Sequence, residues 1–414
     1  MRKFALALTN LEIWVVGLCV VGSFISQRLL PIAVSSALVF ALLRQIAYSR
    51  FSISTPADWP ICLLSMMVPV TCWVTAAPDI TIPQVLRLLA GIGMYYAIVN
   101  WSNSALRMRW LLRGLWLAGL LLALYAFISV QWVTTKLHFI PMAIYSHFQI
   151  MVSDTANPSV MAGNLIIILP CIMGMLLFYG RRLHWFEQGL SILAMSIAII
   201  VLMLTQSRWG IFVFGVILVL LVVLRWKRGW LVLAGGVSLL SVIVITLGPM
   251  SIFDFISSNA TLGGFSGRLE IWSRAVYMIQ DFPYTGVGMG SYGRTADLLY
   301  PFSSFAPGTS THAHNLFLQI ALDLGVPGLI AWLAIWILMF TMSFTLYRHG
   351  RVYQDNWVSG LGAGLLCSQI ALVSHGMLEA VTWGMVKPAP LVWVIWGFTV
   401  ASWYVYVKRV EKFP

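Results

Sequence analysis

About twelve apolar stretches, each long enough to cross a bilayer as a helix, follow one another along this chain. A transmembrane helix needs about 20 mainly apolar residues. Windows of that length predict spans at 10–27, 30–47, 60–77, 84–100, 110–130, 158–180, 187–206, 209–225, 229–248, 315–345, 357–378 and 388–407. Of the 414 residues, 60% are hydrophobic and 9% are charged, whereas a soluble domain needs about 25% charged residues. The sequence therefore predicts an all-α polytopic membrane helix bundle and excludes a soluble fold.

The lysines and arginines alternate between two sets of loops. One set holds 17 of the 25, the other holds 7, and Arg87 lies within the fourth predicted span. Because cytoplasmic loops carry the excess of basic residues, both termini are expected in the cytoplasm and segment 249–314 on the outer face. Membrane topology thereby explains the formal charge of +12, and nucleic acid is not an expected partner.

Segments 131–157 and 249–314 are the two outer connections that are longer than turns, so function is expected there. In the second, Ser266 can cap a helix that begins near Arg268 and stops at Pro283. The spacing places Leu269, Trp272, Val276 and Ile279 on one apolar stripe, so the helix is expected to lie on the membrane surface or against the bundle. The glycine-rich run 286–291 that follows could cradle phosphate oxygens, although most such runs are turns.

Two arginines on the outer side are candidate site residues. Arg208 lies in a tight turn between two spans, where an interfacial arginine that reaches toward lipid phosphates is about as expected as a functional one. Arg268 lies in the first turn of the expected loop helix, where a cation opposes the helix dipole. It is either a solvated surface residue or has an anionic partner, which could be Glu270 or a ligand.

The strongest candidate is His312-Ala313-His314-Asn315 at the start of the tenth span. A metal site needs more than two histidines, and the chain has no HExxH motif and no Asp-x-Asp pair. A neutral histidine beside arginines is suited to accept a proton as a base. Either histidine alone could instead be bonded to loop backbone. Lys387, after Glu379, is an anion contact or an ion-pair partner.

These motifs together resemble the O-antigen ligase and polymerase family of bacterial membrane glycosyltransferases. The resemblance rests on Gln206-Ser207-Arg208-Trp209-Gly210, on Gly267-Arg268 with Trp272 and Ala275, on Pro283-Tyr284-Thr285-Gly286-Val287-Gly288, and on His312-Ala313-His314-Asn315 continuing to Gly325-Val326-Pro327-Gly328. It divides the chain into N-terminal transmembrane helices (1–199), a ligase/polymerase core (200–330) that includes the periplasmic loop 249–314, and C-terminal transmembrane helices (331–414).

The resemblance implies a GT-C-type glycosyltransferase fold and a donor glycan linked to undecaprenyl diphosphate on the periplasmic side. No metal, cofactor or nucleotide sugar is expected. The paired arginines of the family correspond to Arg208 and Arg268, and its catalytic histidine corresponds to His314. Relatives often have aspartate late in the penultimate helix, where this chain has Glu379, and the role of Glu379 stays open.

The implied chemistry suits these residue types. Guanidinium groups bind phosphate oxygens in bidentate fashion and stay charged, so Arg208 and Arg268 are expected to stabilise the departing diphosphate. His314 is expected to take the proton of the attacking hydroxyl, which gives inversion in a single displacement. The residues expected to help bind substrate are His312, Arg294, Lys387 and Asn315.

Four functions are compatible with these features. The first is an O-antigen ligase of the bacterial inner membrane that transfers glycan to lipid A-core. A polymerase that extends another lipid-linked glycan is second, and a protein-directed oligosaccharyltransferase is third. A transporter, the alternative from another class, would need paired ionisable groups near the middle of the membrane. The modest length of the outer loop favours the ligase.

Overall fold

The computed structural model describes residues 2–132, 140–152, 155–248, 265–303, 306–308, 310–383 and 390–408. Over these ranges the chain is helical and has no β-strand, with one isolated bridge between Val130 and Ala156. The all-α prediction is therefore confirmed for the part of the chain that is described.

Every predicted span coincides with a helix. The N-terminal half holds α1 (Arg2–Thr9), α2 (Glu12–Ile25), α3 (Leu30–Tyr48), α4 (Asp58–Val74), α5 (Pro78–Trp101), α6 (Ala105–Ser129), the short α7 (Met142–Tyr145), α8 (Pro158–Tyr179), α9 (Trp185–Leu204), α10 (Arg208–Arg225) and α11 (Trp230–Leu247). The remainder holds α13 (Phe265–Asp281), α14 (Tyr292–Leu299), α15 (Leu316–Val352), α16 (Asn356–Gly376) and α17 (Pro390–Trp403), which continues as a π-helix over Tyr404–Lys408.

Length and apolar composition qualify nine helices of the described ranges as membrane spans. The bent pair formed by α1 and α2, which meet at 50°, raises the number to ten if it crosses as one span. Two more apolar helices, α4 and α11, are shorter than 18 residues over their qualifying ranges. The chain is thus a multi-pass membrane protein, and twelve crossings stay a prediction.

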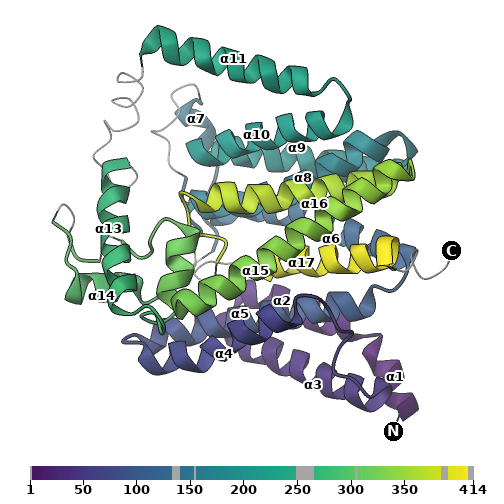
Figure 1. Ribbon diagram of the computed structural model, residues 1–414, viewed down its shortest axis with the longest axis horizontal. Helices are drawn as coiled ribbons and strands as arrows, with labels where there is room; N and C mark the ends of the chain where they lie inside the picture. The colour runs from purple at the N-terminus through teal and green to yellow at the C-terminus, as the bar shows by residue number, and fades with distance from the viewer. Residues whose placement is uncertain are drawn as a thin grey trace.

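Helices α8 and α16 form the centre of the bundle, with the other long helices around them (Figure 1). Glycines allow their backbones to touch: a Cβ atom on Gly174 would lie 2.7 Å from the carbonyl oxygen of Gly360 and 2.8 Å from the Cα of Gly364. Small residues spaced in this way let membrane helices pack closely, although no hydrophobic driving force acts between them.

Helix α15 is broken at Gly325, where φ is 68° and ψ is 176°. The segment before α14 crosses at the break, because Val326 N–H donates to the carbonyl of Pro283 and Val287 N–H donates to that of Leu322, both at 2.7 Å. A Cβ atom on Gly325 would lie 2.4 Å from the Tyr284 carbonyl oxygen. Only glycine fits this left-handed position and this contact.

The connections that carry the candidate residues gather at one end of the bundle. Figure 1 shows α7, α13, α14 and the start of α15 at this end, with α1 and the C-terminal end of α17 at the other. Helix α13 ends before Pro283 as expected, and its predicted apolar stripe is only partly covered by the protein. Ile271, Ala275 and Met278 are buried, whereas Leu269 and Val276 are 50% and 40% exposed.

Candidate functional site

A buried carboxylate, that of Glu379, is the centre of the candidate site. It lies in the turn that follows α16, and the residue is 7% exposed. Its Oε1 atom is 3.2 Å from Nη2 of Arg268, while Oε2 is 3.3 Å from Nδ1 of His314 and 3.7 Å from Nε2 of His312. Three of the residues predicted from the sequence therefore converge on an acid whose role the sequence left open.

The two histidines reach Glu379 from the segment that precedes α15. Their rings are 4.0 Å apart between centroids. His314 has a left-handed backbone with φ of 46°, which is uncommon for a residue other than glycine. Asn315 then caps α15, accepting from the N–H groups of Phe317 and Leu318, and donates 3.0 Å to the Met377 carbonyl. Asn315 thus joins the histidine segment to the turn that carries Glu379.

The electrostatics of the cluster keep Glu379 ionised. Burial by itself raises the pKa of this carboxyl group, but the neighbouring imidazoles of His312 and His314 outweigh burial and hold the pKa well below its usual range. For His312, burial and the adjacent His314 lower the pKa, with Glu379 opposing the change. The cluster therefore combines a fixed negative charge with a His312 ring that tends to stay neutral.

Arg268 retains donor capacity beyond its ion pair. Its Nε atom is buried and has no hydrogen-bond partner among the described residues. The partner expected from the sequence, Glu270, is instead 3.7 Å from Arg274 and accepts hydrogen bonds from Ser303. Arg268 therefore faces Glu379 and keeps one buried N–H donor that no described residue uses.

Arg208 begins α10 beside the end of α16. Ser207 caps α10 by accepting from Gly210 N–H at 3.3 Å. Trp209 Nε1 donates to the Ser374 carbonyl at 2.8 Å, five residues before Glu379 in the sequence. These contacts place the exposed Arg208 at the same end of the bundle as the Glu379 cluster.

Comparison with known proteins identifies the segment that carries most of these groups. Residues 193–333 match a protein-family model described as O-antigen ligase. The match includes Arg208, Arg268, His312 and His314, while Glu379 lies beyond its end. No curated protein matches the chain.

Within the matched segment, Arg294 makes its ion pair with a residue other than Glu379. Its guanidinium pairs with both carboxylate oxygens of Asp79, at 3.0 and 3.2 Å, and the two side chains are 52% and 62% exposed. Lys387, which was also predicted to bind substrate, lies outside the described residues.

The glycine-rich run 286–291 is a structural turn. Gly286, Gly288 and Gly290 all have positive φ. The amides of this run bond within the protein: Val287 N–H to Leu322, Met289 N–H to the Thr71 hydroxyl and Gly290 N–H to the Asp323 carboxylate. The interpretation of this run as a phosphate cradle is therefore not supported, and the turn interpretation holds.

His312, His314 and Glu379 could also hold a metal ion, because one ligand atom from each lies within 4.8 Å of the others. The sequence predicted the two histidines as site residues and left the role of Glu379 open. The guanidinium of Arg268, 3.2 Å from the same carboxylate, repels a cation and attracts an anion. The arrangement as a whole is better suited to an anionic ligand.

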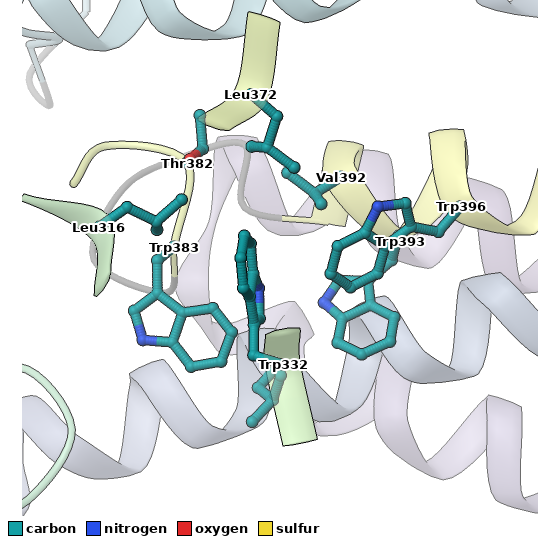
Figure 2. A pocket seen from close by; sticks show the side chains of 9 residues that line it. Leu316, Trp332, Leu372, Thr382, Trp383, Val392, Trp393 and Trp396 are labelled. Atoms are coloured by element: carbon teal, nitrogen blue, oxygen red, sulfur yellow. The ribbon is translucent and has the colours of Figure 1, made fainter. Parts of the chain in front are cut away.

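A small aromatic cavity lies where α15 meets α17 and the 377–383 segment. Figure 2 shows indole rings from α15, α17 and the 377–383 segment gathered around it, with Leu316 and Thr382 on its border. Its volume of about 10 Å³ is room for roughly one water molecule. It is a packing feature beside the site, too small for a sugar.

Two buried acids were not predicted from the sequence as parts of the site, namely Glu379 as the centre of the cluster and Asp323 in α15. Asp323 is 0% exposed and accepts three hydrogen bonds. Both residues are among only 13 acidic residues in the chain, and each is flanked by apolar residues. That setting was the available signal, because an acid in an apolar segment needs a partner.

Proposed function

We propose that this protein is an O-antigen ligase, a membrane glycosyltransferase that moves glycan from undecaprenyl diphosphate to a sugar hydroxyl of lipid A-core. The family match supports ligase or polymerase chemistry. The observation that carries the proposal is the convergence of Arg268, His312 and His314 on Glu379 at one end of a membrane helix bundle.

The contact with Glu379 determines which nitrogen of His314 acts as the base. Nδ1 lies 3.3 Å from the carboxylate, so we assign the ring proton to Nδ1 and the free lone pair to Nε2. Nε2 then takes the proton of the acceptor hydroxyl, and the carboxylate stabilises the imidazolium that forms. A carboxylate that orients a histidine base in this way is a recurring arrangement in hydroxyl activation.

The arginines act on the leaving group. The acceptor oxygen forms a bond to the anomeric carbon as the bond from that carbon to the diphosphate oxygen breaks, and the electron pair stays on the diphosphate. Arg268, with its unused Nε donor, and Arg208 stabilise the negative charge that grows there. A single displacement inverts the anomeric configuration.

The flanking residues complete the proposed site. His312, which contacts both His314 and Glu379, helps to hold the base, and Asn315 fixes the segment that carries both histidines. The alternation of basic loops supports insertion in the bacterial inner membrane, with both termini cytoplasmic and the site facing the periplasm.

The lipopolysaccharide of a strain that lacks the gene tests this function. We expect lipid A-core without O-chains, together with accumulated long glycan on the lipid carrier. A single repeat attached to the core would instead identify a polymerase. An unchanged glycan profile would contradict both. Restoration by the wild-type gene but not by a gene carrying His314→Ala would tie the phenotype to the site.

A further inference from the structure

Three separate segments bring Arg268, the histidines and Glu379 to one place, and a single buried side chain bonds toward all three. Asp323 lies in α15, two residues before the break at Gly325. Its Oδ1 accepts from Gly290 N–H at 3.0 Å and from Gln319 Nε2 at 2.8 Å, and its Oδ2 accepts from Trp383 Nε1 at 2.8 Å.

The bond to Gln319 extends to the histidines. Gln319 is fully buried, and its Oε1 accepts from the N–H of Ala313 at 2.8 Å. Ala313 is the residue between His312 and His314. An amide that donates to Asp323 with Nε2 must present Oε1 on its other side, so the carboxylate fixes the orientation of Gln319 and thereby the backbone between the histidines.

The bond to Trp383 extends to Glu379. Trp383 lies in the segment that follows α16, four residues beyond Glu379. Its indole lines the aromatic cavity of Figure 2 and is 3% exposed. An indole held by packing and by one hydrogen bond to Asp323 limits where the Glu379 turn can lie.

The bond to Gly290 reaches the segment that follows α13, the helix that carries Arg268 in its first turn. Gly290 belongs to the segment that follows α13, and Thr71 strengthens the same junction. The Thr71 hydroxyl accepts from Met289 N–H at 2.7 Å and donates to the Asp323 carbonyl at 2.8 Å. The C-terminal side of the helix that carries Arg268 is thereby held against α15.

We infer that Asp323 is a positioning residue of the proposed transferase, whose carboxylate holds the segments of Arg268, His312–His314 and Glu379 in register. It contacts the site through Gln319, Trp383 and Gly290 and does not itself touch the reacting groups. This inference rests on the proposed function only for its kinetic consequence, because the register itself is a property of the folded protein.

The matched variants are Gln319→Leu and Gln369→Leu. Each removes a buried amide that accepts a hydrogen bond, from Ala313 N–H in the first case and from Trp396 Nε1, at 3.0 Å, in the second. Both residues are at most 1% exposed, so similar losses of thermal stability are expected. Only Gln319 lies in the network of Asp323.

The chemical reactivity of the histidines distinguishes a positioning role of Asp323 from a purely structural one. In purified protein, the rate at which diethyl pyrocarbonate modifies His312 and His314 is followed by mass spectrometry. We expect Gln319→Leu and Asp323→Asn to raise that rate about five- to tenfold, the size expected when one hydrogen bond is lost from a local opening equilibrium. Gln369→Leu should leave it unchanged.

The kinetic consequence is a fall in kcat for glycan transfer of about 10- to 100-fold in Gln319→Leu, with KM for the lipid-linked donor within about twofold. If Asp323→Asn does not fold, Trp383→Phe, which removes one donor only, should still raise the labelling rate. Equal labelling in Gln319→Leu and wild type, or equal effects in Gln319→Leu and Gln369→Leu, overturns the inference. If the labelling rate rises in Gln319→Leu but the wild-type protein transfers no glycan, the positioning role is supported and the proposed function is rejected.

Discussion

At the scale of single residues, Glu379 is the group on which the site depends. Its two oxygens have different partners: Oε1 faces Arg268, and Oε2 faces the two histidines. The same carboxylate therefore sets the position of the proposed leaving-group contact and of the proposed base. A negative charge is needed for both tasks, because a neutral group would neither hold the guanidinium nor stabilise the imidazolium.

Glu379→Gln tests this dependence. The amide keeps the size of the side chain but removes its charge, so we expect the rate of glycan transfer to fall about 100-fold. Glu379→Asp keeps the charge on a shorter side chain and should lose less, about tenfold. Both rates are measured with purified protein, and transfer by Glu379→Gln at the wild-type rate would show that the charge has no part in the reaction.

The pKa shifts of the cluster predict that acid destabilises the protein. The lowered pKa of His312 means that the unfolded chain gains a proton below about pH 6.5 while the folded chain resists it. Glu379, with its pKa well below the usual range, contributes stability that is present above about pH 4.3 and is lost as the pH falls toward its folded pKa.

Thermal denaturation in detergent between pH 7 and pH 4 measures this effect. The midpoint should fall with pH in wild type, and His312→Asn should flatten the part between pH 7 and pH 5. His147→Asn, at an exposed position, is the control and should follow wild type. A steeper fall in His312→Asn than in wild type would contradict a lowered pKa for His312 in the folded protein.

At the scale of elements, the position of the helices followed from the sequence and the orientation of their faces did not. Runs of about 20 apolar residues predict helices because a bilayer leaves few other solutions. In α13, the stripe predicted from periodicity leaves Leu269 and Val276 exposed, while Ile271, Ala275 and Met278 form the buried contact. Periodicity alone could not choose between two overlapping stripes.

The site was predictable only as far as local motifs reach. Arg208, Arg268 and His314 were singled out from their neighbours in the sequence. Glu379 is 65 residues beyond His314, and its contact with His314 follows from the packing of α15 against α16, which no local pattern contains. Arg294 was expected near substrate on the basis of its charge, whereas the structure pairs it with Asp79.

The break in α15 gives an element-scale prediction. Gly325→Ala would force a side chain into a left-handed position 2.4 Å from the Tyr284 carbonyl oxygen. We expect a loss of at least about 2 kcal/mol of stability, read as a lower denaturation midpoint. Gly114→Ala, where a Cβ atom meets nothing within 4 Å, should be neutral or slightly stabilising. Equal midpoints for the two variants would mean that the break is not strained by a side chain.

At the scale of the whole molecule, α13 and the start of α15, which carry Arg268 and follow the histidines, lie at the end of the bundle opposite α1 and the C-terminal end of α17 (Figure 1). The charge pattern of the loops predicts that the cluster faces the periplasm. In a variant without its five native cysteines, a cysteine at Gln280 in α13 should react with a membrane-impermeant maleimide added to intact cells with a permeable outer membrane. A cysteine at Tyr353, after α15, should react only after the inner membrane is opened. The reverse pattern would invert the orientation and remove a periplasmic reaction.

The central claim is that Arg268 and His314, held around Glu379, transfer a glycan from a lipid diphosphate. The rate of transfer by purified protein in liposomes, with lipid-linked glycan and lipid A-core supplied, tests it most directly. We predict that Arg294→Ala, which loses only an exposed ion pair, transfers within about twofold of the wild-type rate, while Arg268→Ala and His314→Ala are folded and slower by about 100-fold or more. Wild-type rates in both of the latter variants, or movement of intact lipid-linked glycan across the membrane without transfer, would contradict the claim.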